Sequence, residues 1–271
     1  MWQGFWDFSL LQPLLDDFMS IYVGPASTTM LNLPMSPAWM WNHSGIPLHV
    51  PHNPNQILSP FLAYTDDLGS TLKENETLRS LSTYYGRVAS YILAGGLVDE
   101  AGKAHCSESL PSRFGFYEVL NEMPHHLNIS TYTVLFDMIT NSIKEESLAA
   151  ARACNLSRID VVDKLQLVAI EQGEWRDAES ARYFLKNVKK HRASPIAWHF
   201  YCKVNQSDNE IEYETFFEQI DTFVAQGLGP LAAILREESP ETKIFVNEFG
   251  TMLPNDIDTD PYVRPYITRL Q

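Results

Sequence analysis

Five short apolar segments alternate with helical segments along this chain. They are TTMLNLPM (28–35), GFYEVLNE (115–122), LQLVAIE (165–171), PIAWHFYC (195–202) and KIFVNEFG (243–250). Runs such as LQLVAI and KIFV are apolar without interruption, which is typical of strands covered on both faces. Strands separated by helices favour parallel pairing, because parallel neighbours need a crossover connection. The alternation therefore predicts an α/β fold built on a parallel sheet.

Apolar residues recur at helical spacing between these segments. The spacing predicts helices over about 11–22, 78–93, 130–153 and 175–188, and a long helix that contains residues 216–224. At 271 residues and 45% hydrophobic content, the chain can bury a sizeable core. No composition break, repeat or low-complexity stretch marks a second unit, so we expect residues 1–271 to form a single domain.

Charge and missing motifs exclude several classes of function. The formal net charge is −14, and no cluster of Lys and Arg offers a surface for nucleic acid or anionic lipid. No apolar run is long enough to span a membrane. Neither a G-x-G-x-x-G or Walker-type loop nor a G-x-S-x-G elbow occurs. No His, Cys, Asp and Glu residues have compact metal-ligand spacing, so we predict no cofactor and no metal.

Compartment signals in the sequence conflict. The first residues, MWQGFWDFSL, lack the pattern of a signal peptide. Five N-x-[ST] sequons nevertheless occur, at Asn42, Asn75, Asn128, Asn155 and Asn205. The five sequons can have arisen by chance, or they can be glycosylation sites of a secreted protein, and the sequence favours neither interpretation. The three cysteines suggest no disulfide framework, although one pair could form. The expectation is a secreted or lysosomal protein.

Carboxylates stand where three of the expected strands end. They are Glu122, Glu171 and Glu248, and Asn121 and Asn247 directly precede two of them. In a closed barrel, the carboxyl ends of parallel strands face the same side, so Glu122 and Glu248 would come together. Two carboxyl groups roughly 5 to 5.5 Å apart are what retaining cleavage of a glycosidic bond requires. Glu171 can equally cap the helix that follows it.

The segments FYEVLNE and FVNEFG resemble the two signatures of clan A glycoside hydrolases, which are retaining (β/α)8 TIM barrels. The resemblance implies that Glu122, ending the fourth strand, is the acid/base. It also implies that Asn121 hydrogen-bonds the sugar 2-hydroxyl and that Glu248, ending the seventh strand, is the nucleophile. YEVLNEMPHH is closest to family 39, which includes β-xylosidases and α-L-iduronidases. This chain has Met123 where that family commonly has Pro, and Pro124 comes one place late.

Five further residues are candidates for contact with a carbohydrate. His199 and Tyr201 alternate onto one face of a strand and resemble the clan's sixth-strand residues, which line the sugar site and hydrogen-bond the nucleophile. The alternative is that both side chains are packed and hydrogen-bonded within the core. Trp39 and Trp41 are candidate stacking platforms, and packing in the core is an equally good interpretation. His125 follows the expected acid and either contacts substrate or lies in a solvated loop.

The function expected from these features is retaining hydrolysis of an O-glycosidic bond in a carbohydrate substrate. The alternative is a non-catalytic carbohydrate-binding barrel. Counting from the two signatures makes TTMLNLPM the third strand, so strands 3 to 7 are recognisable while strands 1, 2 and 8 have no counterpart. We therefore expect an incomplete TIM barrel and a chain that is a fragment.

Overall fold

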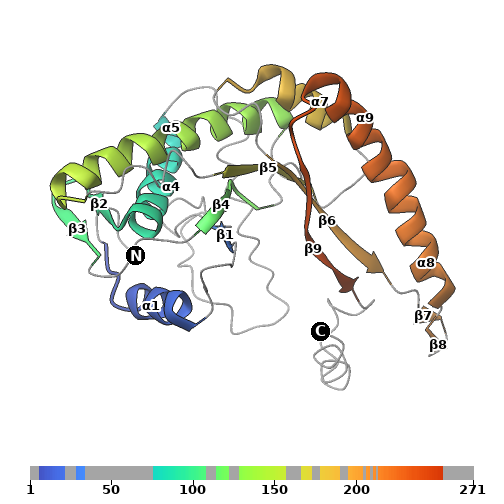
Figure 1. Cartoon of the computed structure of the whole chain (residues 1–271), viewed down its shortest axis with the longest axis horizontal. Coiled ribbons are helices and arrows are strands. Elements are labelled where there is room, and N and C mark those ends of the chain that lie inside the picture. The colour runs from blue at the N-terminus through green and yellow to red at the C-terminus, as the bar shows by residue number, and fades with distance from the viewer. Residues whose placement is uncertain are drawn as a thin grey trace, which may run out of the picture.

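A computed structural model describes residues 6–21, 29–33, 76–107, 114–121, 128–156, 166–172, 178–189, 195–203, 206–207, 210–211 and 213–252. Its centre is a five-stranded parallel sheet in the order β1-β4-β5-β6-β9 (Figure 1). The strands are β1 (Thr29–Asn32), β4 (Phe114–Glu118), β5 (Gln166–Gln172), β6 (Ile196–Lys203) and β9 (Ile244–Met252). These are the five segments predicted from the sequence, and they pair in chain order, so both the strands and their parallel arrangement are confirmed.

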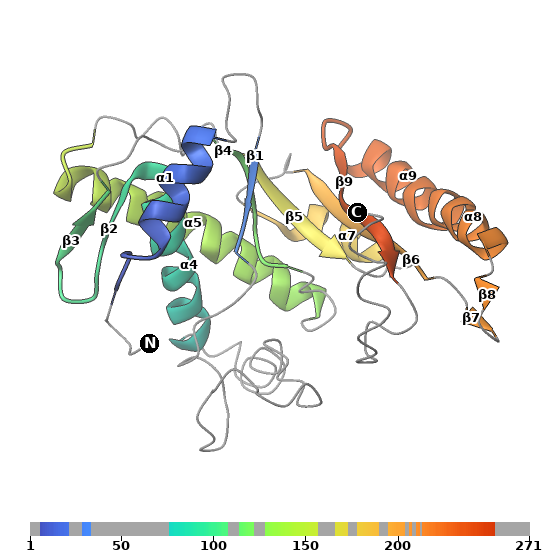
Figure 2. The same ribbon diagram turned by 90° about the horizontal axis from the view of Figure 1, so that it is seen from below.

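The sheet is curled, as seen from below in Figure 2. Phe116 on β4 and Phe245 on β9 meet edge to face, with ring centroids 5.0 Å apart, although β5 and β6 lie between their strands. A flat sheet would separate strands three places apart by about 14 Å, given the usual spacing of nearly 5 Å per strand. The contact therefore requires strong curvature toward the face that carries Phe116 and Phe245. The fold is a mixed α/β fold with a curled, half-barrel sheet.

Helices cover the convex side of this sheet (Figures 1 and 2). They are α1 (Leu11–Ile21), α4 (Glu76–Ala94), α5 (Ile129–Ala153), α7 (Ala178–Asn187), α8 (Tyr213–Thr222) and α9 (Gly229–Glu238). A π-helical segment, η4 (Phe223–Leu228), joins α8 to α9. The long helix predicted around residues 216–224 is therefore confirmed, and η4 and α9 continue its path to residue 238.

The sequence reading also missed two antiparallel hairpins. One pairs β2 (Gly96–Val98) with β3 (Ala104–Cys106), and a small one pairs β7 (Gln206–Ser207) with β8 (Glu210–Ile211). The first lies between α4 and β4, where the sequence predicted neither a helix nor a strand. Its turn is built by Asp99, whose carboxylate accepts hydrogen bonds from the backbone N–H groups of Ala101 and Lys103. Such side-chain to backbone bonds are the usual chemistry of an Asx turn.

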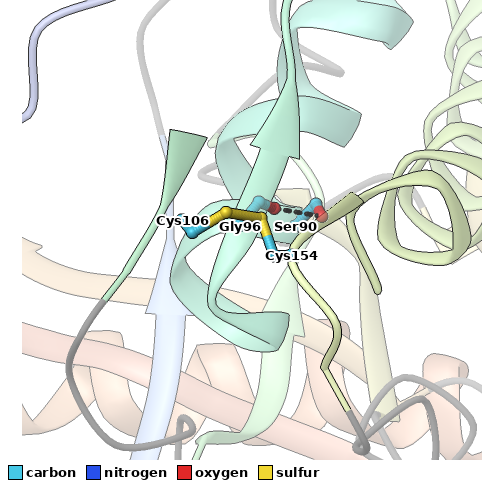
Figure 3. Close-up of a disulfide and its surroundings, with 4 residues drawn as sticks. All are labelled: Ser90, Gly96, Cys106 and Cys154. Carbon is cyan, nitrogen blue, oxygen red and sulfur yellow. Dashed lines mark hydrogen bonds between the residues drawn. A yellow bond between two sulfur atoms is a disulfide. The ribbon is translucent and has the colours of Figure 1, made fainter. Parts of the chain in front are cut away.

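A disulfide joins this hairpin to a helix. Cys106 at the end of β3 is bonded to Cys154, which follows the last residue of α5 (Figure 3). Gly96 lies beside the bond, and a Cβ placed on it would approach the Cys154 sulfur to 2.9 Å. Its carbonyl accepts a hydrogen bond from the buried Ser90 hydroxyl at 2.7 Å. The absence of a side chain at residue 96 thus lets hairpin, helix and disulfide come together.

The main core lies between the sheet and helices α4, α5, α7 and α9. Tyr85, Tyr117, Phe136, Phe184 and Trp198 are among its fully buried aromatic side chains. A smaller cluster contains Phe200, Cys202 and Phe223, where β6 packs against η4. Trp198 in the main core and Phe200 in the smaller cluster both hold β6, the strand that carries His199 and Tyr201.

Candidate active site

The predicted nucleophile is contacted by both predicted residues of the neighbouring strand. The Tyr201 hydroxyl donates a hydrogen bond to Oε2 of Glu248 at 2.5 Å, and Nδ1 of His199 lies 3.3 Å from the same oxygen. His199 is fully buried, while the Glu248 side chain is 36% exposed. The carboxylate is therefore held from the protein side and remains open to solvent. The expected grouping of these three side chains is present.

Strand register explains why they meet. His199 pairs with Glu248 and Tyr201 pairs with Gly250 between the parallel strands β6 and β9. A register shift at Trp198 and His199 inserts Asn247 between the paired positions, which places Glu248 opposite His199. A Cβ at residue 250 would come within 3.1 Å of the Tyr201 ring. Gly250 therefore leaves the space in which that ring lies beside the carboxylate.

The residue before the predicted acid/base lies at the end of β4. Leu120 is buried and has a φ of 69°, a left-handed conformation that is uncommon for a residue other than glycine. This conformation turns the chain directly after the strand. Asn121 then accepts a hydrogen bond from the Asn32 side chain at 3.0 Å, through its Oδ1. Glu122, His125, Trp39 and Trp41 lie outside the described residues, so their predicted roles stay predictions.

A buried carboxylate that the sequence reading did not single out lies beneath this edge of the sheet. Glu118 on β4 is only 2% exposed. Its Oε2 accepts a hydrogen bond from the Asn32 amide at 2.7 Å, and its Oε1 accepts one from the Asn247 amide. Asn32 is on β1 and Asn247 on β9, so one carboxylate connects three strands. A charged residue inside an otherwise apolar strand was the signal that could have revealed it.

Two strand ends are also fixed by the first turn of α5. The Tyr132 hydroxyl accepts a hydrogen bond from the backbone N–H of Ile170 at 2.9 Å and donates one to the carbonyl of Val119 at 3.3 Å. Ile170 has a φ of 51°, which is a rare conformation for a β-branched residue. Tyr132 therefore stabilises the irregular backbone where β4 and β5 end, on the same side of the sheet as Asn121.

Other chemistry finds little support within the described part of the chain. Burial raises the pKa of the Cys202 thiol, which disfavours the thiolate that nucleophilic chemistry would need. No group of three His, Cys, Asp or Glu residues there is arranged to hold a metal ion. None of the described helices is both long and apolar enough to cross a membrane. The group around Glu248 remains the strongest candidate site, although Glu248 lies in the middle of β9 and not at the end of its strand as the sequence predicted.

Comparison with protein-family models, with curated proteins and with solved structures found no match.

Proposed function

We propose that this chain is a retaining O-glycoside hydrolase of the clan A type, with the fold of a partial TIM barrel. Glu248 is its nucleophile and Glu122 its acid/base. The observation that carries the proposal is the placement of Glu248 on β9, an outer strand of the described curled sheet, where Tyr201 and His199 hold one of its oxygens. A partly exposed, oriented carboxylate is what attack on an anomeric carbon requires.

The contacts of Glu248 assign different roles to its two oxygens. Among the described residues, both contacts fall on Oε2, so Oε1 is the oxygen positioned for attack. Donation by Tyr201 fixes the orientation of the carboxylate. The charge of Glu248 in turn favours the protonated form of Glu122, which can then protonate the leaving oxygen. Once the glycosyl-enzyme has formed, that charge is gone and Glu122 can ionise to activate water.

The substrate proposed is a carbohydrate, and the compartment proposed is the secretory pathway or the lysosome. The disulfide between Cys106 and Cys154 supports the compartment, since disulfides persist in oxidising environments. Resemblance to family 39 favours xylosides and iduronides as the first substrates to test. Asn121, His199 and Tyr201 are the described residues proposed to line the sugar site, joined by His125, Trp39 and Trp41.

Labelling with a mechanism-based fluorosugar tests the proposal directly. A 2-fluoro glycoside that the enzyme accepts should become covalently attached to Glu248, and peptide mass spectrometry locates the label. Glu248→Ala should abolish turnover, and added azide should partly restore it, giving a glycosyl azide of inverted configuration. Equal activity in this variant and in the parent would exclude Glu248 as the nucleophile. Binding of sugars without release of any aglycone would favour the non-catalytic barrel instead.

A further inference from the structure

The buried carboxylate of Glu118 contacts the asparagine neighbours of the catalytic pair. Its two oxygens accept from Asn247, the residue before Glu248, and from Asn32, which also donates to Asn121, the residue before Glu122. We propose that Glu118 is a positioning residue that sets the backbone of β4 and β9 so that the two catalytic carboxylates face each other. This inference rests on the proposed function.

The position of Glu118 suits this role better than direct catalysis. At 2% exposure it is buried, three residues before Asn121 in the chain, whereas the Glu248 side chain is open to solvent. An ionised carboxylate is costly to bury unless donors surround it, and two amide groups supply such donors here. Only the Nδ2 group of an asparagine side chain can donate a hydrogen bond, so its Nδ2 must face the carboxylate. Glu118 therefore also fixes the orientation of the Asn32 and Asn247 side chains.

The strands involved explain why one residue can act on both ends of the site. β4 ends at Glu118, three residues before Asn121, and β9 carries Asn247 and Glu248, yet β4 and β9 are not neighbours in the sheet. The side-chain hydrogen bond from Asn247 to Glu118 is a direct polar link between these two strands across the concave face, next to the contact of Phe116 with Phe245. Loss of this link should change the spacing of the catalytic carboxylates, to which retaining chemistry is sensitive.

The variant Glu118→Gln tests the inference, because it keeps the shape of the side chain but presents one donor where an acceptor is needed. Per active site titrated with the fluorosugar, kcat should fall by about a hundred-fold with little change in KM. Asn247→Ala removes the same hydrogen bond from its other end, and it replaces Glu118→Gln as the test if that variant does not fold. It should also lower kcat with little change in KM. The control is Glu218→Gln, the same change at an exposed position on α8.

Three outcomes separate the hypotheses. A wild-type rate per titrated site in both variants would overturn the positioning role while leaving the proposed function intact. Circular dichroism measures the folded fraction, and fluorosugar titration counts the active sites. If activity falls only in proportion to these two quantities, the positioning role would also be overturned, because loss of a purely structural residue has the same effect. A wild-type chain that neither reacts with the fluorosugar nor turns over any glycoside would overturn the proposed function, and the positioning role with it.

A second inference comes from the far end of α5 and does not depend on the active site. The sequon Asn155-Leu156-Ser157 directly follows Cys154, which is bonded to Cys106. Asn155 is exposed and has a φ of 53°, a turn conformation that asparagine tolerates. We infer that Asn155 carries an N-linked glycan, attached in the compartment that oxidises the two cysteines.

The chemistry is the same as at any sequon. Nδ2 of Asn155 forms a bond to C1 of the first sugar of a lipid-linked oligosaccharide, the bond from C1 to the pyrophosphate oxygen breaks, and Nδ2 loses a proton as the lipid pyrophosphate leaves. The disulfide forms when Cys106 and Cys154 pass two electrons and two protons to a disulfide of a thiol oxidoreductase. Both reactions belong to the lumen of the secretory pathway.

The glycan would lie away from the candidate active site. α5 contains 25 residues and is therefore about 37 Å long. Its first turn contacts the ends of β4 and β5 through Tyr132, whereas its last residues lie beside β2 and β3 (Figure 1). Asn128, the other described sequon, caps the first turn through Oδ1, which accepts from the N–H of Thr131 at 2.9 Å. A glycan on Asn155 should thus leave catalysis unaffected.

Peptide mapping of the protein from the cells that make it tests this inference. Enzymatic removal of glycans in heavy-oxygen water should convert Asn155 into labelled aspartate, and the unreduced digest should contain Cys106 linked to Cys154. Asn187, exposed at the end of α7 and outside any sequon, is the control that should stay unlabelled. Recovery of the Asn155 peptide only in unmodified form would overturn the inference.

Discussion

Tyr201 is the residue whose contact with the candidate nucleophile is most direct. Its hydroxyl donates to Oε2 of Glu248 at 2.5 Å, and its ring lies over Gly250. A hydrogen bond to a charged group contributes about 1.5–3 kcal/mol, and each 1.4 kcal/mol corresponds to about a factor of ten. We therefore expect the hydroxyl to matter more than the ring to the orientation of Glu248.

Tyr201→Phe should lower kcat/KM for an activated aryl glycoside by about ten- to hundred-fold while leaving the melting temperature nearly unchanged. Steady-state kinetics and thermal unfolding measure the two effects. Tyr183→Phe removes a hydroxyl from a 40% exposed tyrosine on α7 and is the matched control. Unaltered kinetics in Tyr201→Phe would show that the hydroxyl does not act on the nucleophile.

Among the elements, the β2–β3 hairpin depends on its link to α5. The disulfide closes a loop with a sequence separation of 48 between Cys106 and Cys154. A cross-link of this kind stabilises a protein chiefly by restricting its unfolded chain, typically by about 2–4 kcal/mol. The hairpin has only three residues in each strand, so its own pairing contributes little.

The double variant Cys106→Ser, Cys154→Ser should therefore lose about 2–4 kcal/mol of unfolding free energy in urea melts. A reducing agent should lower the stability of the parent protein by a similar amount and leave the double variant unchanged. If the reducing agent has no effect on the parent, the disulfide is either absent or without consequence for stability.

Helices α4 and α5 approach most closely at Gly86. A Cβ placed there would lie 2.8 Å from the backbone carbonyl carbon of Ser142, which cannot move without shifting α5. By contrast, a Cβ on Gly229, at the exposed start of α9, would have its nearest neighbour at 3.4 Å. The two glycines share helical surroundings but differ in the space around them.

Gly86→Ala should lower the unfolding free energy by about 1–3 kcal/mol, since the added methyl group forces the helices apart. Gly229→Ala should be neutral or stabilising by up to about 1 kcal/mol, because alanine favours helix. Denaturant melts of both variants measure the contrast. Equal effects at the two positions would mean that the close approach of α4 and α5 does not constrain stability.

Over the whole molecule, the curled sheet ends on a strand with exposed apolar side chains. Within the described sheet, β9 is an edge strand, and Phe249 and Val246 on it are 62% and 40% exposed. Edge strands with apolar side chains are prone to pair with other chains. This surface is the physical basis for expecting that the chain, expressed alone, is poorly soluble.

Phe249→Lys should raise the soluble fraction and slow aggregation, because a charge on an edge strand opposes pairing between molecules. Light scattering at several protein concentrations measures the change. Leu10→Lys makes a similar exchange at an 82% exposed position before α1, away from the sheet, and is the control. Equal improvement in both variants would attribute the effect to net charge instead of to the strand edge.

The fold was largely predictable from the sequence because its signals are local. Continuous apolar runs such as KIFV predict buried strands, and helical periodicity between them makes the parallel pairing follow. All five strands and their order were found in this way. The grouping of Glu248, His199 and Tyr201 was also foreseeable, since strands β6 and β9 are adjacent and the resemblance named their residues.

What the sequence could not determine depends on distances between strands that are not neighbours. Side-chain alternation gives no curvature, so the contact between Phe116 and Phe245 was not predictable. Glu118 was overlooked for the same reason, because its partners Asn32 and Asn247 lie 86 and 129 residues away. The choice of Cys106 and Cys154 as the bonded pair likewise needed the packing of a hairpin on α5. Local preferences set the strands, helices and polar strand ends, whereas only the curled tertiary structure decided which of those polar groups meet.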